Sequence, residues 1–205
     1  MASNANTSRG TVPAKCVSCD RSMDSPLFCA HCRTLYPADD VSHFELFGLE
    51  PSYDLDPEVI RRTYLNLARA IHPDRFPRAA EEVERLSERV SARVNRAFQT
   101  LSDPVLRAEY LLEMLGGKSA TQDKNVPAEV LSRTLMLREE IEEAKASDDQ
   151  ESLGRLRAQV GKLCEQTLAA VAELARRLPG DEKCRQALRA KLNSMKYYQK
   201  LLEQL

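Results

Sequence analysis

Residues 94–112, which read VNRAFQTLSDPVLRAEYLL, decide the fold of this chain. Their apolar side chains recur every three or four residues, and the Asp-Pro pair at 103–104 interrupts the pattern, so one helix ends here and another begins. Upstream, His72 ends an earlier amphipathic helix, because the residue before a proline, here Pro73, is pushed out of the helical region. We therefore predict an antiparallel hairpin of two helices that end at His72 and at about Leu101.

The composition also favours a protein built from helices. Aromatic residues make up only 5% of the chain, which has no Trp and 7 Gly, so a large β-sandwich or barrel is disfavoured. A short helical pattern at His43–Glu50 precedes the hairpin. Beyond a polar linker at 116–126, helical spacing continues through 128–146, 149–178 and 181–204, which predicts a three-helix bundle. The predicted fold class is all-α: a helical hairpin plus a C-terminal three-helix bundle, with a small N-terminal metal module.

Four of the six cysteines form two CxxC pairs within that module, residues 14–38. Two thiolates from each pair can complete a tetrahedron around one ion, and the module is too short to fold on a core of its own, so the metal would supply the folding free energy. We predict a structural zinc site with no open coordination position. Iron in a rubredoxin-like cage and two redox-active pairs are the alternatives, although no βαβ pattern surrounds the cysteines. The predicted ligands are Cys16, Cys19, Cys29 and Cys32.

The turn His72-Pro73-Asp74 lies beside basic side chains on a nearly neutral chain. Thirty basic and 31 acidic residues leave a net charge of −1, which disfavours a general nucleic-acid binder. No nucleophile or second acid accompanies His72 in the sequence, so we do not expect an enzyme. The turn and its basic neighbours form either a docking corner or a helix stop beside a solvated helix face. The basic neighbours are Arg61, Arg62, Arg69 and Arg75.

The turn and the 94–112 stretch together resemble a J-domain, the module with which co-chaperones stimulate ATP hydrolysis by DnaK-type chaperones. The resemblance spans residues 42–115, and the strings HPDRF, RAEYLL and LMLREEIEEA narrow it to the HscB family of iron–sulfur cluster assembly. Some members of that family carry an N-terminal tetracysteine module. The resemblance implies a non-enzymatic co-chaperone of an HscA/DnaK-type ATPase. In that role Asp74 would present a fixed charge, His72 and Pro73 would keep the corner rigid, and Arg61, Arg62, Arg69 and Arg75 would steer the encounter.

The helix that follows the linker carries more apolar residues than its core face needs. At about 100° per residue, Leu131, Leu135 and Met136 lie away from a core stripe that begins at Val130, and Tyr197 on the last helix also points away from its stripe. An exposed apolar patch favours protein binding, and the alternative is packing between domains. The HscB resemblance implies that the partner is the scaffold protein IscU, contacted by Leu131, Ser132, Leu135, Met136, Glu139 and Tyr197. Ser132 and Met136 depart from the family pattern.

Two other functions stay open at this point: a general J-protein for unfolded clients, and a zinc-dependent nucleic-acid-binding protein. The chain lacks the Gly-rich repeats and CxxCxGxG motifs of the general type, and only Lys15, Arg21 and Arg33 supply positive charge near the cysteines. We also expect weak self-association through an exposed Phe28 and Tyr36. No nucleic-acid partner is expected.

The remaining expectations concern location and domain division. No apolar run approaches the ~18 residues that a membrane span needs, so no membrane partner is expected. The cysteines favour a reducing compartment, a bacterial cytoplasm or alternatively a mitochondrial matrix. We expect a disordered lead at 1–13, the zinc module at 14–38, the J-domain at 42–115, the linker at 116–126 and the scaffold-binding three-helix bundle at 127–205.

Overall fold

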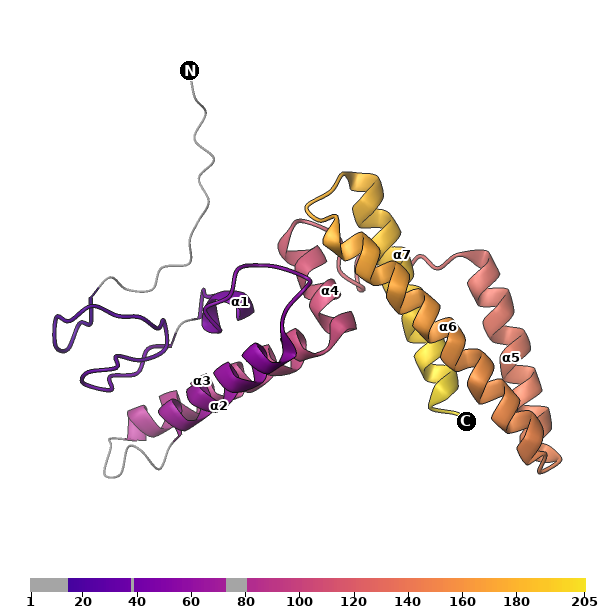
Figure 1. The fold of residues 1–205 in the computed structure, drawn as a ribbon, viewed down its shortest axis with the longest axis horizontal. Coiled ribbons are helices and arrows are strands. Elements are labelled where there is room, and N and C mark those ends of the chain that lie inside the picture. The colour runs from indigo at the N-terminus through magenta and orange to yellow at the C-terminus, as the bar shows by residue number, and fades with distance from the viewer. Residues whose placement is uncertain (1–14, 38, 73–80) are drawn as a thin grey trace, which may run out of the picture. The chain divides into compact units, whose positions relative to one another are not determined.

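The computed structural model describes residues 15–37, 39–72 and 81–205 (Figure 1). Within these ranges the secondary structure consists of seven helices and two isolated β-bridges, with no strand, so the predicted all-α fold class is confirmed. The expected disordered lead at 1–13 lies outside the described residues, and so do Pro73, Asp74 and Arg75. None of the helices in the described ranges has the length and apolarity that crossing a membrane requires.

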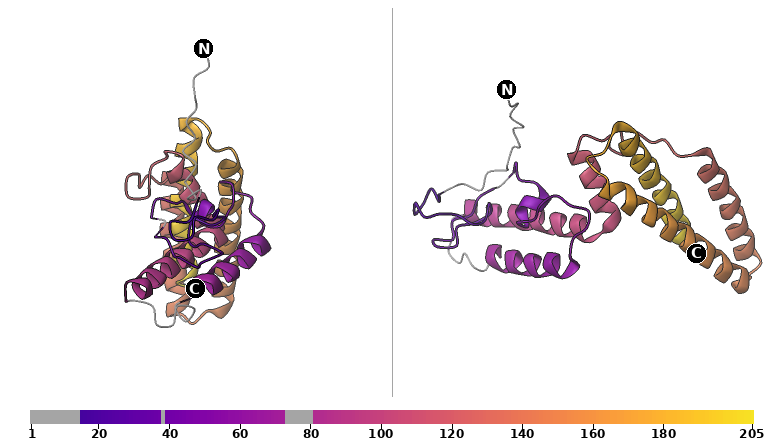
Figure 2. Two further views of the ribbon diagram at one scale, coloured as in Figure 1. Left: turned by 90° about the vertical axis from the view of Figure 1, so that its left-hand side faces the viewer. Right: turned by 45° about the horizontal axis from the view of Figure 1, so that its top comes forward.

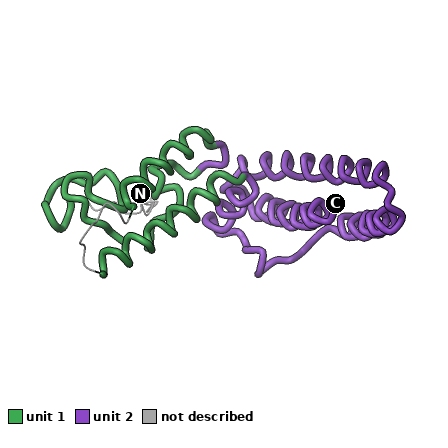
Figure 3. Tube along the Cα trace, turned by 90° about the horizontal axis from the view of Figure 1, so that it is seen from below, with its two compact units in different colours: residues 1–51, 55–103 green, residues 52–54, 104–205 purple. Residues whose placement is uncertain are grey.

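The chain divides into two compact units (Figure 3). Unit 1 comprises Met1–Pro51 and Leu55–Asp103, and unit 2 comprises Ser52–Asp54 and Pro104–Leu205. The division therefore falls within the 94–112 stretch, where the Asp-Pro pair separates two helices.

Unit 1 is built around a helical hairpin of α2 (Pro57–Ile71) and α3 (Glu81–Ser102), which lie side by side (Figure 1). The Asp56 carboxylate accepts a hydrogen bond of 2.9 Å from the backbone N–H of Glu58 and so begins α2. His72 follows the helix with an extended ψ of 133°, as expected before a proline. The Tyr64 ring stacks on Phe98 at 4.2 Å between centroids. The two helices pack through their buried stripes. These stripes consist of Ile60, Leu67 and Ile71 on α2 and of Val90, Val94, Ala97 and Leu101 on α3.

The first helix is shorter than the sequence predicts. The pattern at His43–Glu50 gives only one turn, α1 (His43–Leu46), capped by Ser42. Gly48 adopts a φ of +64°, and the backbone N–H of Leu49 donates to the carbonyl of Phe44 at 2.9 Å. A residue in this left-handed conformation terminates a helix, and glycine adopts it without the strain of a side chain.

Unit 2 contains α4 (Pro104–Met114), α5 (Ala128–Ala146), α6 (Gln150–Arg176) and α7 (Glu182–Leu202), of which α5, α6 and α7 run alongside one another (Figure 2). These three helices match the predicted bundle. The α5 core stripe predicted from its periodicity is buried in full: Val130, Thr134, Leu137, Ile141 and Ala144. The core stripe of α7 ends at Leu201, which is buried, whereas Leu202 is only partly buried.

Helix α4 packs against α6 and α7 and so forms part of unit 2. Arg189 of α7 is 1% exposed, and its Nη2 donates to Oε1 of Glu109 on α4 at 3.0 Å. Nζ of Lys196 contacts the same carboxylate oxygen at 3.1 Å. The carboxylate of the RAEYLL string therefore pairs with two cations of α7.

A loop segment also joins this unit. The guanidinium groups of Arg107 and Arg176 lie 5.2 and 5.8 Å from the ring centroid of Tyr53, which is buried. Nε of Arg176 donates to both carboxylate oxygens of Asp54, and this hydrogen bond is the main cause that holds the pKa of Asp54 below its usual value.

Candidate functional site

The four predicted metal ligands come together in unit 1. Their Sγ atoms all lie within 4.8 Å of one another, with Cys16 and Cys32 3.4 Å apart and Cys19 and Cys29 3.7 Å apart. A tetrahedral zinc with Zn–S bonds of about 2.3 Å requires S···S separations of about 3.8 Å. All six cysteines of the chain are free. The predicted clustering is thus confirmed, and the cluster could hold a metal ion.

Tyr36 supports this cluster. The sequence analysis expected this residue to be exposed, but it is partly buried. Its ring packs against Cys16, Met23 and Cys29, and its hydroxyl donates to Sγ of Cys16 at 3.2 Å. The same hydroxyl accepts from the backbone N–H of Val17 at 3.0 Å. The hydrogen bond that Tyr36 donates is the main reason why the pKa of the Cys16 thiol falls to about 6. The lower pKa favours the thiolate, which is the form of cysteine that binds a metal. Phe28 is also half-buried, so neither residue is the exposed self-association contact that was predicted.

The module lies beside the α2–α3 hairpin. The Arg93 guanidinium of α3 donates to the backbone carbonyls of Asp39, at 2.7 Å, and Val41. A small hollow of about 210 Å³ is lined by Phe28, Cys29, Ala30 and Arg33 of the module and by Ala70 of α2. The second CxxC pair therefore lies next to the last turn of α2.

The described part of the predicted docking corner is the end of α2. His72 is exposed, and the buried Ser87 hydroxyl of α3 donates to the carbonyl of Ile71 at 2.6 Å. This hydrogen bond satisfies one carbonyl that the helix end leaves without an intrahelical partner, and it fixes the backbone just before His72. The predicted basic residues Arg61, Arg62 and Arg69 are all exposed on α2. The other three corner residues, Pro73, Asp74 and Arg75, lie outside the described residues.

The second predicted surface is exposed on unit 2. Leu131 is 43% exposed, Leu135 58%, Met136 60% and Tyr197 38%, and Ser132 and Glu139 are exposed too. The helical periodicity predicted this exposure, since the core stripe of α5 points to the other side. On α5 these positions occupy one sector of about 140°, from Leu131 at about 100° to Met136 at about 240° around the helix from Val130.

Sequence reasoning missed a cluster of positive charge beside Tyr197. A surface pocket of about 520 Å³ is lined by Tyr197, Arg138 of α5 and Lys196 and Lys200 of α7, together with Lys124 and Val126 from the linker. Arg138 lies about 80° around α5 from Val130, close to Leu131 at about 100°. Leu131 and Leu135 therefore lie on the side of α5 that carries Arg138, and Tyr197 of α7 lines the pocket on that side. A count of charges along the sequence does not reveal this cluster, because its four cations come from three separate segments, the linker, α5 and α7.

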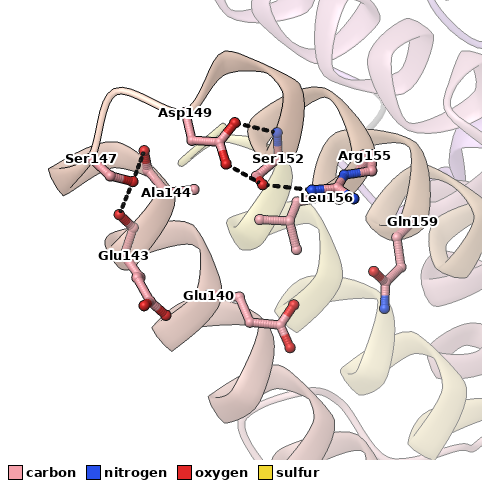
Figure 4. Close-up of a pocket in the computed structure, with 9 residues that line it drawn as sticks. All are labelled: Glu140, Glu143, Ala144, Ser147, Asp149, Ser152, Arg155, Leu156 and Gln159. Atoms are coloured by element: carbon pink, nitrogen blue, oxygen red, sulfur yellow. Dashed lines mark hydrogen bonds between the residues drawn. The ribbon is translucent and has the colours of Figure 1, made fainter.

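A pocket of about 470 Å³ on the other side of α5 has an acidic lining, Glu140, Glu143 and Asp149 (Figure 4). Some of its polar groups, those of Ser147, Asp149 and Ser152, already serve the turn between α5 and α6. Asp149 accepts from the backbone and hydroxyl of Ser152, and the Ser152 hydroxyl in turn accepts from Arg155 at 2.8 Å. These contacts cap α6, and in the described part of the chain no buried side-chain polar atom of this pocket lacks a hydrogen-bond partner.

Comparison with known proteins adds two family matches. The DnaJ domain matches residues 42–110, and the HSCB C-terminal oligomerisation domain matches residues 126–205. The Co-chaperone protein HscB homolog of Shewanella halifaxensis is 42% identical over 113 residues, which cover 55% of this chain and 65% of that protein. The match therefore spans less than two thirds of the Shewanella protein.

Two further relatives extend this comparison. The Iron-sulfur cluster co-chaperone protein HscB homolog of Arabidopsis thaliana is 30% identical over 182 residues, 87% of this chain and 68% of that protein. The solved structure of chaperone HscB from Vibrio cholerae matches with a TM-score of 0.66 and 30% identity, over 80% of this chain and 94% of that one.

Proposed function

Because this chain belongs to the HscB family of co-chaperones, we propose that it stimulates an HscA/DnaK-type ATPase and delivers an IscU-type iron–sulfur scaffold to it for cluster transfer. The observation that carries the proposal is the pair of separate exposed surfaces. One is the basic outer face of α2 that leads to His72, and the other is the apolar patch of Leu131, Leu135 and Tyr197. The chain acts as an adaptor and performs no chemistry itself.

The chaperone surface works by positioning and charge. The Ser87–Ile71 hydrogen bond holds the backbone before His72, so little conformational entropy is lost when the corner docks. Arg61, Arg62 and Arg69 attract an acidic surface of the ATPase, and salt weakens this attraction. Asp74 and Pro73 complete the corner, and Arg75 adds to the positive charge beside it. Docking shifts the chaperone towards the conformation that hydrolyses ATP.

The ATPase role is tested by His72→Gln in the full chain. The variant is expected to lose stimulation of purified HscA while retaining the helical circular dichroism of the parent. His31→Gln, at an exposed histidine of the metal module, is the matched control and should stimulate normally. Stimulation by His72→Gln at the parent level would reject the docking role of the corner.

The scaffold role is tested at the apolar patch. Leu135→Ala combined with Tyr197→Ala should weaken binding of purified IscU, measured by calorimetry, by ~2 kcal/mol or more if these side chains anchor the complex. Leu65→Ala, at an exposed apolar residue of α2, is the control. An unaltered affinity in the double variant would place the scaffold elsewhere.

The tetracysteine cluster is proposed to hold one structural zinc. All four positions around the ion would be filled by Cys16, Cys19, Cys29 and Cys32, so the ion would stabilise the module and offer no open site for catalysis. The thiols must stay reduced, so the compartment proposed for this protein is a bacterial cytoplasm or, alternatively, a mitochondrial matrix. Elemental analysis should find one zinc per chain, and Cys29→Ser should abolish it. A stoichiometric yield of iron in place of zinc would overturn the metal assignment.

A further inference from the structure

The pocket beside Tyr197 combines positive charge with an apolar wall. Lys124, Arg138 and Lys200 are exposed, and in the described part of the chain their side chains have no ion pair or hydrogen bond. Lys196 adds a fourth cation, although its Nζ contacts Glu109. One carboxylate, that of Glu203, also lines the pocket. Four cations against one anion is a local excess on a chain whose net charge is −1.

The apolar wall continues into the exposed patch. Val126 and Tyr197 line the pocket, and Leu131 and Leu135 lie on the same side of α5 as Arg138. The acidic side chain of Glu139 flanks the patch on the side away from the pocket, since it lies about 180° around α5 from Val130. The apolar patch is therefore bordered by negative charge on one side and by positive charge on the other.

We propose that this basic pocket receives a carboxylate-bearing segment of the scaffold protein that covers the Leu131–Leu135–Tyr197 patch. The proposal rests on the scaffold-binding function proposed above. Charges at the rim of an apolar contact contribute little affinity, but they accelerate association and fix the orientation of the partner. A scaffold with Asp or Glu opposite Lys200 and basic residues opposite Glu139 can dock in only one direction. The negative charge on one side of the patch and the positive charge on the other thereby determine which end of the scaffold faces the rest of the complex.

The continuity of the pocket with the patch favours a protein segment over a free anion. The cations are spread over α5, α7 and the linker, and they flank an aromatic ring that offers a contact for an apolar side chain. Such a lining suits carboxylates that alternate with apolar residues. Inorganic phosphate, by contrast, would gain nothing from Val126 and Tyr197.

The test measures the association rate of purified IscU with the full chain by stopped flow at 50 mM NaCl. Lys124→Glu combined with Lys200→Glu should lower the rate constant by roughly 3- to 10-fold and leave the dissociation rate within about 2-fold. The difference should largely disappear at 500 mM NaCl, where screening is short-ranged. The matched control is Lys162→Glu with Lys191→Glu, two exposed lysines outside the pocket, which changes the net charge by the same amount.

Three outcomes decide the proposal. A selective loss in the pocket variant supports it. Equal rates for the two double variants would reduce the effect to net charge and overturn it. Competition by inorganic phosphate beyond that of NaCl at matched ionic strength would make the pocket a general anion site and also overturn it. If Leu135→Ala with Tyr197→Ala leaves IscU binding intact, the scaffold does not bind at this patch, and this result is distinguishable from failure of the pocket alone.

Discussion

The ion pair between Glu109 of α4 and Arg189 of α7 predicts that removal of the glutamate charge destabilises the protein much more than removal of the arginine. Arg189 is almost fully buried, and Glu109 is its charged partner at 3.0 Å. Glu109→Gln keeps the shape of the side chain and removes its charge, which leaves a buried guanidinium uncompensated. Breaking a buried pair in this way costs about 3–5 kcal/mol. Because the Glu109 side chain retains 17% exposure, we expect the lower end, about 3 kcal/mol.

Removal of the arginine should cost much less. Arg189→Met takes a charge out of the interior, and Glu109 keeps the partly exposed Lys196 as a partner. In addition, Nε and Nη1 of Arg189 are buried and have no hydrogen-bond partner among the described residues, so the arginine is incompletely satisfied there. Its replacement should therefore destabilise by about 1 kcal/mol or less. The double variant should resemble Arg189→Met alone, so the coupling energy should equal the cost of Glu109→Gln, about 3 kcal/mol.

Urea unfolding followed by circular dichroism at 222 nm measures the four free energies of this cycle. Amide hydrogen exchange locates the loss in α4 and α7. If Arg189→Met destabilises the protein as much as Glu109→Gln does, or if the two effects simply add, the reasoning about an uncompensated buried charge is wrong.

Four further predictions concern unit 1. Ser87→Ala leaves the last carbonyl of α2 without its hydroxyl partner and should lower the free energy of unfolding by about 1–2 kcal/mol, measured in urea. Burial, assisted by nearby arginines, holds the pKa of His43 below its usual value, so the unfolded chain binds more protons. Stability should fall as the pH drops from about 7 to 5, and His43→Gln should flatten this slope. Tyr36→Phe should raise the pKa of Cys16 and weaken zinc binding about 10-fold in a chelator competition. Chelation of the metal from the parent should remove amide protection from residues 15–37 and leave the helical signal of α5–α7 unchanged.

Periodic features were predictable because each depends on local spacing. The α5 core stripe followed directly from steps of three and four residues, and the same count placed Leu131 and Leu135 in solvent. The start of α2 followed from Asp56 and Pro57, two residues whose preference for a helix beginning is intrinsic. The paired CxxC spacing likewise brought four thiols together, since each pair needs only a short turn.

Contacts between distant residues were not predictable in this way. Ser87 reads as an ordinary helix residue, and only the packing of α3 on α2 brings its hydroxyl to the Ile71 carbonyl. Glu109 and Arg189 are 80 residues apart, and a charged residue on a helix is expected in solvent unless its partner is known. The early end of α1 was not predicted, because Gly48 lies inside the apolar pattern at His43–Glu50 and its left-handed conformation appears only in the structure.

The place of α4 limits how this protein could be recombined. This helix completes the RAEYLL string by which a J-domain is identified, yet Leu111 and Leu112 are buried in the same unit as the three-helix bundle. A gene fusion that transplanted the signature without the bundle would place these leucines in water. A fusion that transplanted the bundle without α4 would deprive Arg189 of its counterion. A chimera with a foreign J-domain must therefore keep the native α4 together with the bundle.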